Sequence, residues 1–248
     1  MPDTRLHRGK APEDDHLFGP QMLDLLGRAT ADSSLLLSRG YAEKSTLKLV
    51  GDRYSLTARQ RVAVGRCACS DQQLAVRKKN QCPTDYIQNK TLLLDGYNIL
   101  ITLESALSGG YIFRGRDGCF RDLAGIHGTY RKVTETIPAI KMIGQVLTEL
   151  NLQKAVWYLD SPVSNSGRLK TIIRSLFQNC PFENEVQLVP NPDKELAAAE
   201  HCIATSDSAI LDQCKQWLNL PLLLLNYLQQ QGLSFHLIDL STTGNPAA

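Results

Sequence analysis

The spacing of apolar residues changes about a third of the way along the chain. Between residues 20 and 79, apolar residues such as Met22, Leu25 and Leu26 recur at three- and four-residue intervals, which predicts amphipathic helices. After Pro83, short apolar runs alternate with helical patterns. This alternation indicates a mostly parallel sheet with helices on both faces. The sequence therefore predicts an α/β domain preceded by a small all-helical domain.

Breaker residues and charge set the expected boundaries. The first 19 residues carry prolines, glycines and the acidic cluster Glu13-Asp14-Asp15, which predicts an extended or mobile arm. We expect four parts: a mobile arm at 1–19, a basic helical domain at 20–87, an α/β domain at 88–241 and a tail at 242–248.

Within the α/β domain the expected elements alternate. Strands are predicted at 91–95, 154–160, 185–190 and 203–207, with a last small pair at 222–225 and 234–240; helices are predicted at 98–107, 134–150, 166–179, 191–202 and 208–218. A long loop at 111–128 is rich in glycine, arginine and aspartate, which is typical of a lid or binding loop. The alternative is a hairpin insertion that turns at Asp117-Gly118. For His127, in the same loop, we expect a structural role.

Charge and cysteine content narrow the classes of protein only a little. Residues 1–90 contain 15 basic and 10 acidic residues, whereas residues 91–248 contain 12 and 15. A basic front half suits contact with a polyanion, although solvated surface helices give the same pattern. The longest apolar run is far too short to span a bilayer, and an odd number of cysteines, seven, fits reduced thiols. We expect a cytoplasmic protein with no membrane association.

Acidic residues follow several of the predicted strands. Asp95, Asp160 and Asp207 each end an apolar run, and Asp193 stands just beyond another. Because the carboxyl ends of parallel strands lie on one edge of a sheet, these acids should converge in one pocket. Each acid alone has a simpler explanation as a helix cap or a first-turn residue.

Converging carboxylates without a supporting histidine or cysteine favour Mg²⁺ or Mn²⁺. A divalent cation would offset the repulsion among the acids, and a pair of such ions can activate water for phosphodiester hydrolysis. The interpretation from the residues is therefore a metal-dependent nuclease.

The order of these motifs resembles PIN-like nuclease domains, especially the NYN branch. The resemblance covers about residues 88–240 and rests on Asp95-Gly-Tyr-Asn98, Tyr-Leu-Asp160, Pro192-Asp193-Lys-Glu-Leu and Ala204-Thr-Ser-Asp207. The helical region carries Ser38-Arg-Gly-Tyr and Val50-Gly-Asp-Arg-Tyr-Ser-Leu-Thr-Ala-Arg-Gln-Arg. With these motifs, the whole chain also resembles an uncharacterised prokaryotic family in which a helical domain of unknown function precedes such a domain.

The resemblance implies a three-layer α/β/α fold and cleavage of RNA or structured nucleic acid. It implies that Asp95, Asp160, Asp193 and Asp207 bind the metal. It implies a catalytic role for Asp95, Asp160 and Asp207, with Asn98 assisting through its amide. The long loop and the missing acid on the following helix depart from the common pattern. Either Asp117 or Asp122 is a candidate for the missing ligand, and Arg116 or Arg121 for a phosphate clamp. The candidate substrate contacts are Arg59, Arg66, Arg116, Asp117, Arg121, Asp122 and Lys194.

Two other functions remain open from the sequence. A non-catalytic RNA-binding module could keep the fold and bind through the arginine loop and the basic helices. A metal-dependent phosphatase or nucleotide hydrolase could use a similar acid cluster, although Tyr97 stands where a haloacid-dehalogenase-type Asp-x-Asp motif has its second acid. The sequence does not indicate an oligomeric state.

Overall fold

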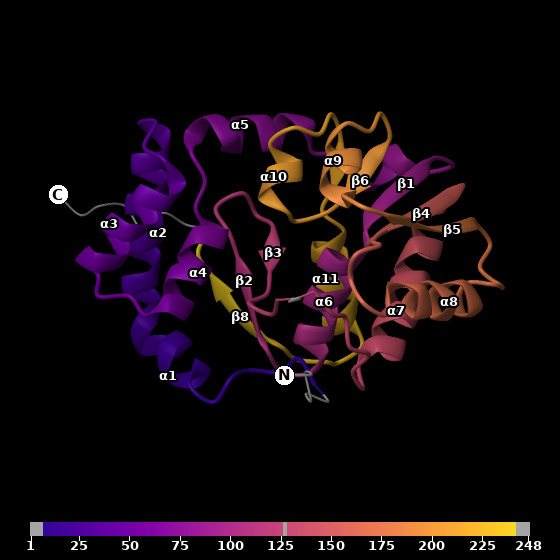
Figure 1. The fold of residues 1–248 in the computed structure, drawn as a ribbon, viewed down its shortest axis with the longest axis horizontal. Coiled ribbons are helices and arrows are strands. Elements are labelled where there is room, and N and C mark those ends of the chain that lie inside the picture. Colours follow the sequence, from indigo (N-terminus) through magenta and orange to yellow (C-terminus); the bar gives the residue numbers. More distant parts are fainter. Residues whose placement is uncertain (1–6, 126–127, 242–248) are drawn as a thin grey trace.

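The computed structural model describes residues 7–125 and 128–241. The predicted tail and His127 lie outside these ranges. Figure 1 shows helices α2–α4 on one side of the molecule, the large sheet on the other, and a small sheet between them. No helix in the described ranges is long and apolar enough to cross a membrane.

The large sheet has five parallel strands in the order β5-β4-β1-β6-β7. Their bounds are β1 Thr91–Asp95, β4 Lys154–Asp160, β5 Glu183–Val189, β6 Cys202–Ala204 and β7 Trp217–Leu218. The central strand β1 is buried on both faces, because alternate side chains of a strand point to opposite sides. Leu92 and Leu94 enter one apolar core, and Leu93 enters another.

Helices cover both faces of this sheet. The core that contains Leu92 and Leu94 is closed by α6 Gly96–Leu107, α7 Thr136–Glu149, α8 Ser166–Leu176 and α11 Leu220–Gln230. The core that contains Leu93 is closed by two short helices, α9 Pro192–Ala197 and α10 Ser208–Leu211. The predicted α/β class, with a parallel sheet between helical layers and a helical N-terminal region, is confirmed.

The N-terminal region contains five α-helices and two 3₁₀ helices within the described residues. These are α1 Asp14–Phe18, η1 Pro20–Met22, α2 Leu23–Ser38, α3 Glu43–Arg53, α4 Ala58–Cys67, α5 Asp71–Asn80 and η2 Thr84–Ile87. Their apolar core also includes Phe113 and Ile238 from the small sheet, and Leu240 just after β8. The helical region and the α/β region therefore share a core through that sheet.

The small sheet has the order β3-β2-β8, with bounds β2 Tyr111–Arg114, β3 Phe120–Arg121 and β8 His236–Asp239. Strands β2 and β3 form an antiparallel hairpin, and Gly118 in its turn has a φ of 78°, a conformation that glycine adopts without strain. The hairpin alternative for the loop at 111–128 is thus the observed structure.

Three local predictions differ from the structure. The strand expected at 222–225 is wrong, because this run lies inside α11, which Pro221 opens and Asn219 caps. The helix expected at 208–218 stops at Leu211, and its end forms β7 instead. The helix expected at 191–202 stops at Ala197, before β6 begins. Short apolar runs fit a helix and a buried strand equally well.

The stretch expected to be a mobile arm is packed within its described part, residues 7–19. Arg8 is buried, and its guanidinium donates to Glu104 and to the Arg131 carbonyl. Phe18 packs edge-on against Phe113, with 4.9 Å between ring centroids. This segment therefore packs against both α6 and β2 and connects them to the helical region.

Candidate functional site

The connections of the large sheet reverse direction beside β1. From β1 the chain moves outward to β4 and β5, then returns to β6 on the other side of β1 and continues to β7. Such a switch point leaves a crevice outside the carboxyl ends of the two central strands, where open α/β sheets bind ligands. Asp95 ends β1, and residues 205–207 follow β6, so both segments line this crevice.

Asp95 is held in the floor of the crevice. Its carboxylate accepts a 2.7 Å hydrogen bond from the Thr205 hydroxyl, and the residue is only 8% exposed. Burial raises its pKa to about 7; the Thr205 hydrogen bond opposes this rise, and the charges of Asp207 and Asp193 add to it. Although Asp95 precedes α6, its side chain makes no capping hydrogen bond. The backbone N–H of Asn98, in the first turn of α6, also lowers the pKa of Asp95, so the carboxylate lies at the start of the helix without forming a full cap.

Gly96 lets the chain turn directly from β1 into α6. A Cβ at this position would lie 2.9 Å from the backbone oxygen of Tyr158 and 2.6 Å from a methyl of Leu159. Because β4 approaches so closely, a larger residue would push Asp95 and the start of α6 away from the sheet.

Asn98 connects α6 to the end of β6. Its amide oxygen accepts from the Ser206 backbone N–H at 2.9 Å and from the Ser206 hydroxyl at 2.8 Å. With the oxygen engaged in this way, the NH₂ group is the part of Asn98 suited to donate to a ligand.

The other three acids lie farther out than Asp95. Asp95 pairs in register with Tyr158, so Asp160 stands two residues beyond it along β4. Asp207 is half-buried and caps α10, accepting from Ala209 N–H at 2.8 Å and from Ile210 N–H at 3.3 Å. Asp193 is exposed in the first turn of α9, where Asn191 is the cap.

The acids influence one another's pKa but do not form a single cluster. Burial, followed by the charges of Asp207 and Asp160, raises the pKa of Asp193, and burial raises that of Asp160. Asp193 itself lines a separate cavity with Lys194 and Gln213. The four predicted acids are therefore spread along the carboxyl edge of the sheet, with Asp95 and Asp207 at its centre.

The donor set fits Mg²⁺ or Mn²⁺ by its chemistry, because hard cations prefer oxygen ligands. Among residues 7–125 and 128–241, no three His, Cys, Asp or Glu side chains are close enough to form a metal cage. Mg²⁺ commonly uses one or two carboxylates and keeps several waters. Asp95 and Asp207, which are linked through the Thr205 hydroxyl, are the two acids closest to the crevice, and Asp193 and Asp160 lie farther along the edge.

A cavity of about 490 Å³ reaches the site at Asn98, Ser206 and Asp207; Asp95, Asp160 and Asp193 do not line it. On the α/β side it is lined by Tyr97, Asn98 and Asp207, and on the helical side by Glu43 of α3 and Arg66 of α4. The helical region thus forms one wall of the space that leads to the crevice.

Several residues predicted to bind substrate are structural instead. Arg121 is 5% exposed, donates to both Asp117 oxygens at 2.9 and 2.6 Å, and donates to the Ser206 carbonyl at 2.8 Å. Arg77 completes this buried cluster through a 2.6 Å bond to Asp117. Arg121 and Asp117 are therefore not available to a phosphate or a metal, and they fix the loop that carries Ser206.

The remaining candidates divide by their partners. Arg116 donates to the Cys69 carbonyl and to Asp71, Arg59 pairs with Asp14, and buried Asp122 accepts from the Thr102 hydroxyl and the Ala124 N–H. Arg66 is more accessible: it lines the cavity and donates to the Asp122 carbonyl. Lys194 lies exposed on α9 beside Asp193. Arg66 and Lys194 are thus the predicted cations best placed to meet a ligand.

Comparison with known proteins places the α/β region in a family. The model described as Domain of unknown function (DUF5616) matches residues 84–222. The chain belongs to this family. The model described as Protein of unknown function (DUF434) matches residues 25–80. An uncharacterized protein of Methanocaldococcus jannaschii, MJ0935, is 34% identical over 184 residues, which cover 74% of this chain and 88% of that protein. No solved structure matches.

Sequence reasoning missed three residues that organise the site. Thr205 and Ser206 hold Asp95 and Asn98, yet their hydroxyls looked like ordinary loop residues between β6 and Asp207. Arg77 belongs to the helical region that the sequence predicts to be a basic surface, but it is 1% exposed. A signal for Thr205 was its place directly after an apolar strand, level with Asp95 across the β1–β6 pairing.

Proposed function

We propose that this protein is a metal-dependent nuclease that hydrolyses phosphodiester bonds, with RNA as its substrate. One observation supports this most strongly. Asp95 and Asp207 are far apart in sequence but meet at the switch point of the sheet, where the Thr205 hydroxyl donates to Asp95 at 2.7 Å and accepts from the Asp207 N–H at 3.0 Å. The predicted resemblance to PIN-like domains places acids at the same positions.

Asp95 and Asp207 would hold the Mg²⁺ or Mn²⁺ ion, with Asp160 and Asp193 extending the acidic edge. A bound ion of this kind lowers the pKa of a coordinated water and polarises a phosphoryl oxygen. A buried, partly neutral Asp95 is costly without a cation, which is the condition expected of a group kept for binding one.

The neighbouring residues have roles that follow from their contacts. Thr205 and Ser206 keep Asp95 and Asn98 in place, and the Asn98 NH₂ is oriented to donate to a phosphate oxygen. Arg66 in the wall of the cavity that Asp207 lines, and Lys194 in the cavity that Asp193 lines, supply positive charge that suits a polyanionic backbone.

We also propose a cytoplasmic location. All seven cysteines are free thiols, and five of them are buried. Reduced, unpaired cysteines are typical of a reducing compartment, where RNA substrates are present as well.

The test is cleavage of end-labelled single-stranded and structured RNA and DNA by the purified protein with Mn²⁺ or Mg²⁺. We expect metal-dependent cleavage that is abolished by Asp95→Asn and by Asp207→Asn. Asn caps helices as well as Asp does, so Asp207→Asn removes the charge while keeping α10 capped. The matched control is Asp24→Asn, an exposed acid of α2 that pairs with Arg28 and should leave cleavage unchanged.

Two outcomes would replace the proposal. If RNA binds equally to wild type and variants and is never cut, the protein is a binding module. If only a small phosphomonoester such as p-nitrophenyl phosphate is hydrolysed, and the Asp95→Asn variant loses that activity, the site is a phosphatase.

A further inference from the structure

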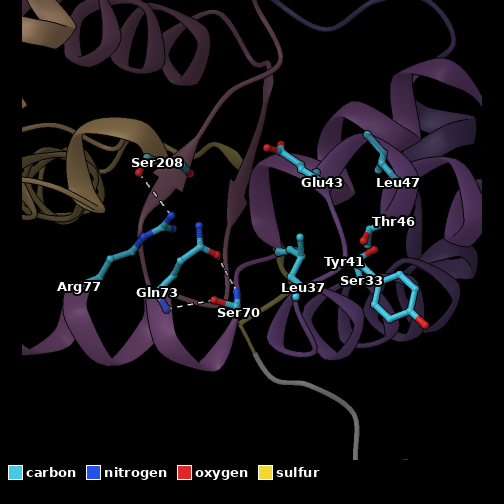
Figure 2. A pocket seen from close by; sticks show the side chains of 13 residues that line it. Ser33, Leu37, Tyr41, Glu43, Thr46, Leu47, Ser70, Gln73, Arg77 and Ser208 are labelled. Atoms are coloured by element: carbon cyan, nitrogen blue, oxygen red, sulfur yellow. Dashed lines mark hydrogen bonds between the residues drawn. The ribbon is translucent and has the colours of Figure 1, made fainter.

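A second cavity lies between the helical region and the α/β region, next to the first. Its volume is about 290 Å³, at the small end of ligand pockets. It is formed by α2, α3, α4 and α5, and Ser208 of α10 closes its α/β side. Figure 2 shows Glu43 and Leu47 of α3 across the pocket from Gln73 and Arg77 of α5.

The two cavities share a wall. Glu43, Leu47, Gly65 and Ser208 line both of them. Ser208 directly follows Asp207, which lines the larger cavity, so a ligand that lies beside Asp207 reaches the smaller cavity at this shared wall. A chain whose backbone lies at the crevice could therefore place a side group in the second cavity.

The chemistry of the smaller cavity excludes a phosphate. Its guanidinium, from Arg77, is already engaged by Asp117 and Asp212. Glu43 is exposed, and among the described residues its carboxylate forms no ion pair. A cavity whose available charge is a carboxylate accepts hydrogen bonds and repels anions.

The remaining wall suits a flat, neutral group. Tyr41 lines the cavity with 52% of its surface exposed, and Leu37 and Leu47 are apolar. Unstacked nucleobases pack against such aromatic and apolar surfaces. Ser33 and Thr46 also line the cavity, and their buried hydroxyls have no hydrogen-bond partner in the described residues. The wall thus retains polar capacity that a ligand could use.

We propose that this cavity binds one unstacked guanine base of a single-stranded RNA whose backbone lies at the carboxylate crevice. The path of the backbone rests on the proposed function. A carboxylate only accepts hydrogen bonds, and two parallel donors suit it best. Guanine presents two adjacent donors, N1–H and the N2 amino group, on its Watson–Crick edge, whereas uracil and adenine do not. Glu43 is therefore the residue that selects the base.

The experiment measures binding rather than cleavage, so that it is independent of catalysis. The Asp207→Asn protein is titrated in EDTA with fluorescent oligouridine that carries one central guanosine, and with all-uridine RNA of the same length. We expect the guanosine-containing RNA to bind about tenfold more tightly, the order expected for one bidentate base contact. Adding Glu43→Gln should remove this preference, whereas adding Glu200→Gln, a change at an exposed acid that pairs with Lys215, should keep it.

Other outcomes of this experiment would reject either the guanine site or the nuclease. Equal affinity for the two RNAs, a preference that survives Glu43→Gln, or no RNA binding at all would overturn the guanine site. Competition by guanosine monophosphate distinguishes a pocket that accepts the free nucleotide from one that needs the chain. Absence of cleavage by the wild type with Mn²⁺, beside an intact guanine preference, would reject the nuclease and leave the base pocket standing.

Discussion

Replacing Asp95 by Asn should make the metal-free protein more stable at neutral pH. Burial and the neighbouring acids raise the pKa of Asp95 from 3.8 to about 7. Between these two values the folded protein holds a proton that the unfolded chain has released, so stability falls as pH rises. Above pH 7 the full penalty is about 4 kcal/mol, because each tenfold change in an ionisation constant is worth about 1.4 kcal/mol.

Chemical denaturation at pH 5 and pH 8 measures this penalty. Over that interval Asp95 alone should lower the free energy of unfolding by about 2.5 kcal/mol in the wild type. Asp95→Asn should lack this contribution, since its amide oxygen can still accept from Thr205 but carries no charge. At pH 8, where the full penalty of about 4 kcal/mol applies to the wild type, the corresponding gain in melting temperature is roughly 8–16 °C for a chain of this size.

A control variant and added metal test whether the Asp95 charge causes this pH dependence. The exposed Asp24→Asn variant should follow the wild-type pH dependence. Adding Mn²⁺ at pH 8 should stabilise the wild type and not Asp95→Asn, because a cation offsets the buried charge only where the carboxylate is present. If Asp95→Asn is less stable than the wild type and loses stability equally between pH 5 and pH 8, the carboxylate is not the strained group described here.

Three further changes test the surroundings of the site. Gly96→Ala should destabilise the fold by about 1–3 kcal/mol, measured by denaturation, because its methyl meets the Tyr158 carbonyl. Asp117→Asn should lower the free energy of unfolding by about 3–5 kcal/mol, because Arg77 and Arg121 lose a charged partner. Burial acts to raise the pKa of Asp117, but the two arginines outweigh it and hold that pKa low. The stabilisation that the Asp117 carboxylate gives is therefore present above about pH 4 and lost in acid. Thr205→Val should raise the Asp95 pKa further and move metal-dependent activity to higher pH.

The parts of the fold that could be predicted are those with strong local patterns. The strands that end at Asp95 and Asp160 are long apolar runs with clear boundaries, so their type and position follow from sequence. The run at 222–225 has no such boundary, and the Pro221 that opens α11 decides its structure. The strands and this run differ in their flanking residues, because an acid ends each strand whereas Pro221 stands at the start of the helical run.

The candidate site could be predicted in part, for a different reason. The carboxyl ends of parallel strands lie on one edge of the sheet regardless of the conformation of the loops. Asp95 and Asp207 follow neighbouring strands and are therefore brought together. The roles of Arg121 and Asp117 depend on how the β2–β3 hairpin packs, and nothing in their own neighbourhood reveals that they are buried. A charged side chain in a loop is usually exposed, so these two were assigned to substrate.

The two family matches divide the chain near residue 80, but the packing does not divide there. The core of the helical region includes Phe113 of β2 and Ile238 of β8, and both cavities at the crevice take a wall from α3. Removing residues 1–80 would expose those side chains to water and open both cavities at once. Loss of activity in such a truncation would therefore say nothing about substrate contacts, whereas Glu43→Gln and Arg66→Gln alter single exposed or half-exposed groups and leave the shared core intact.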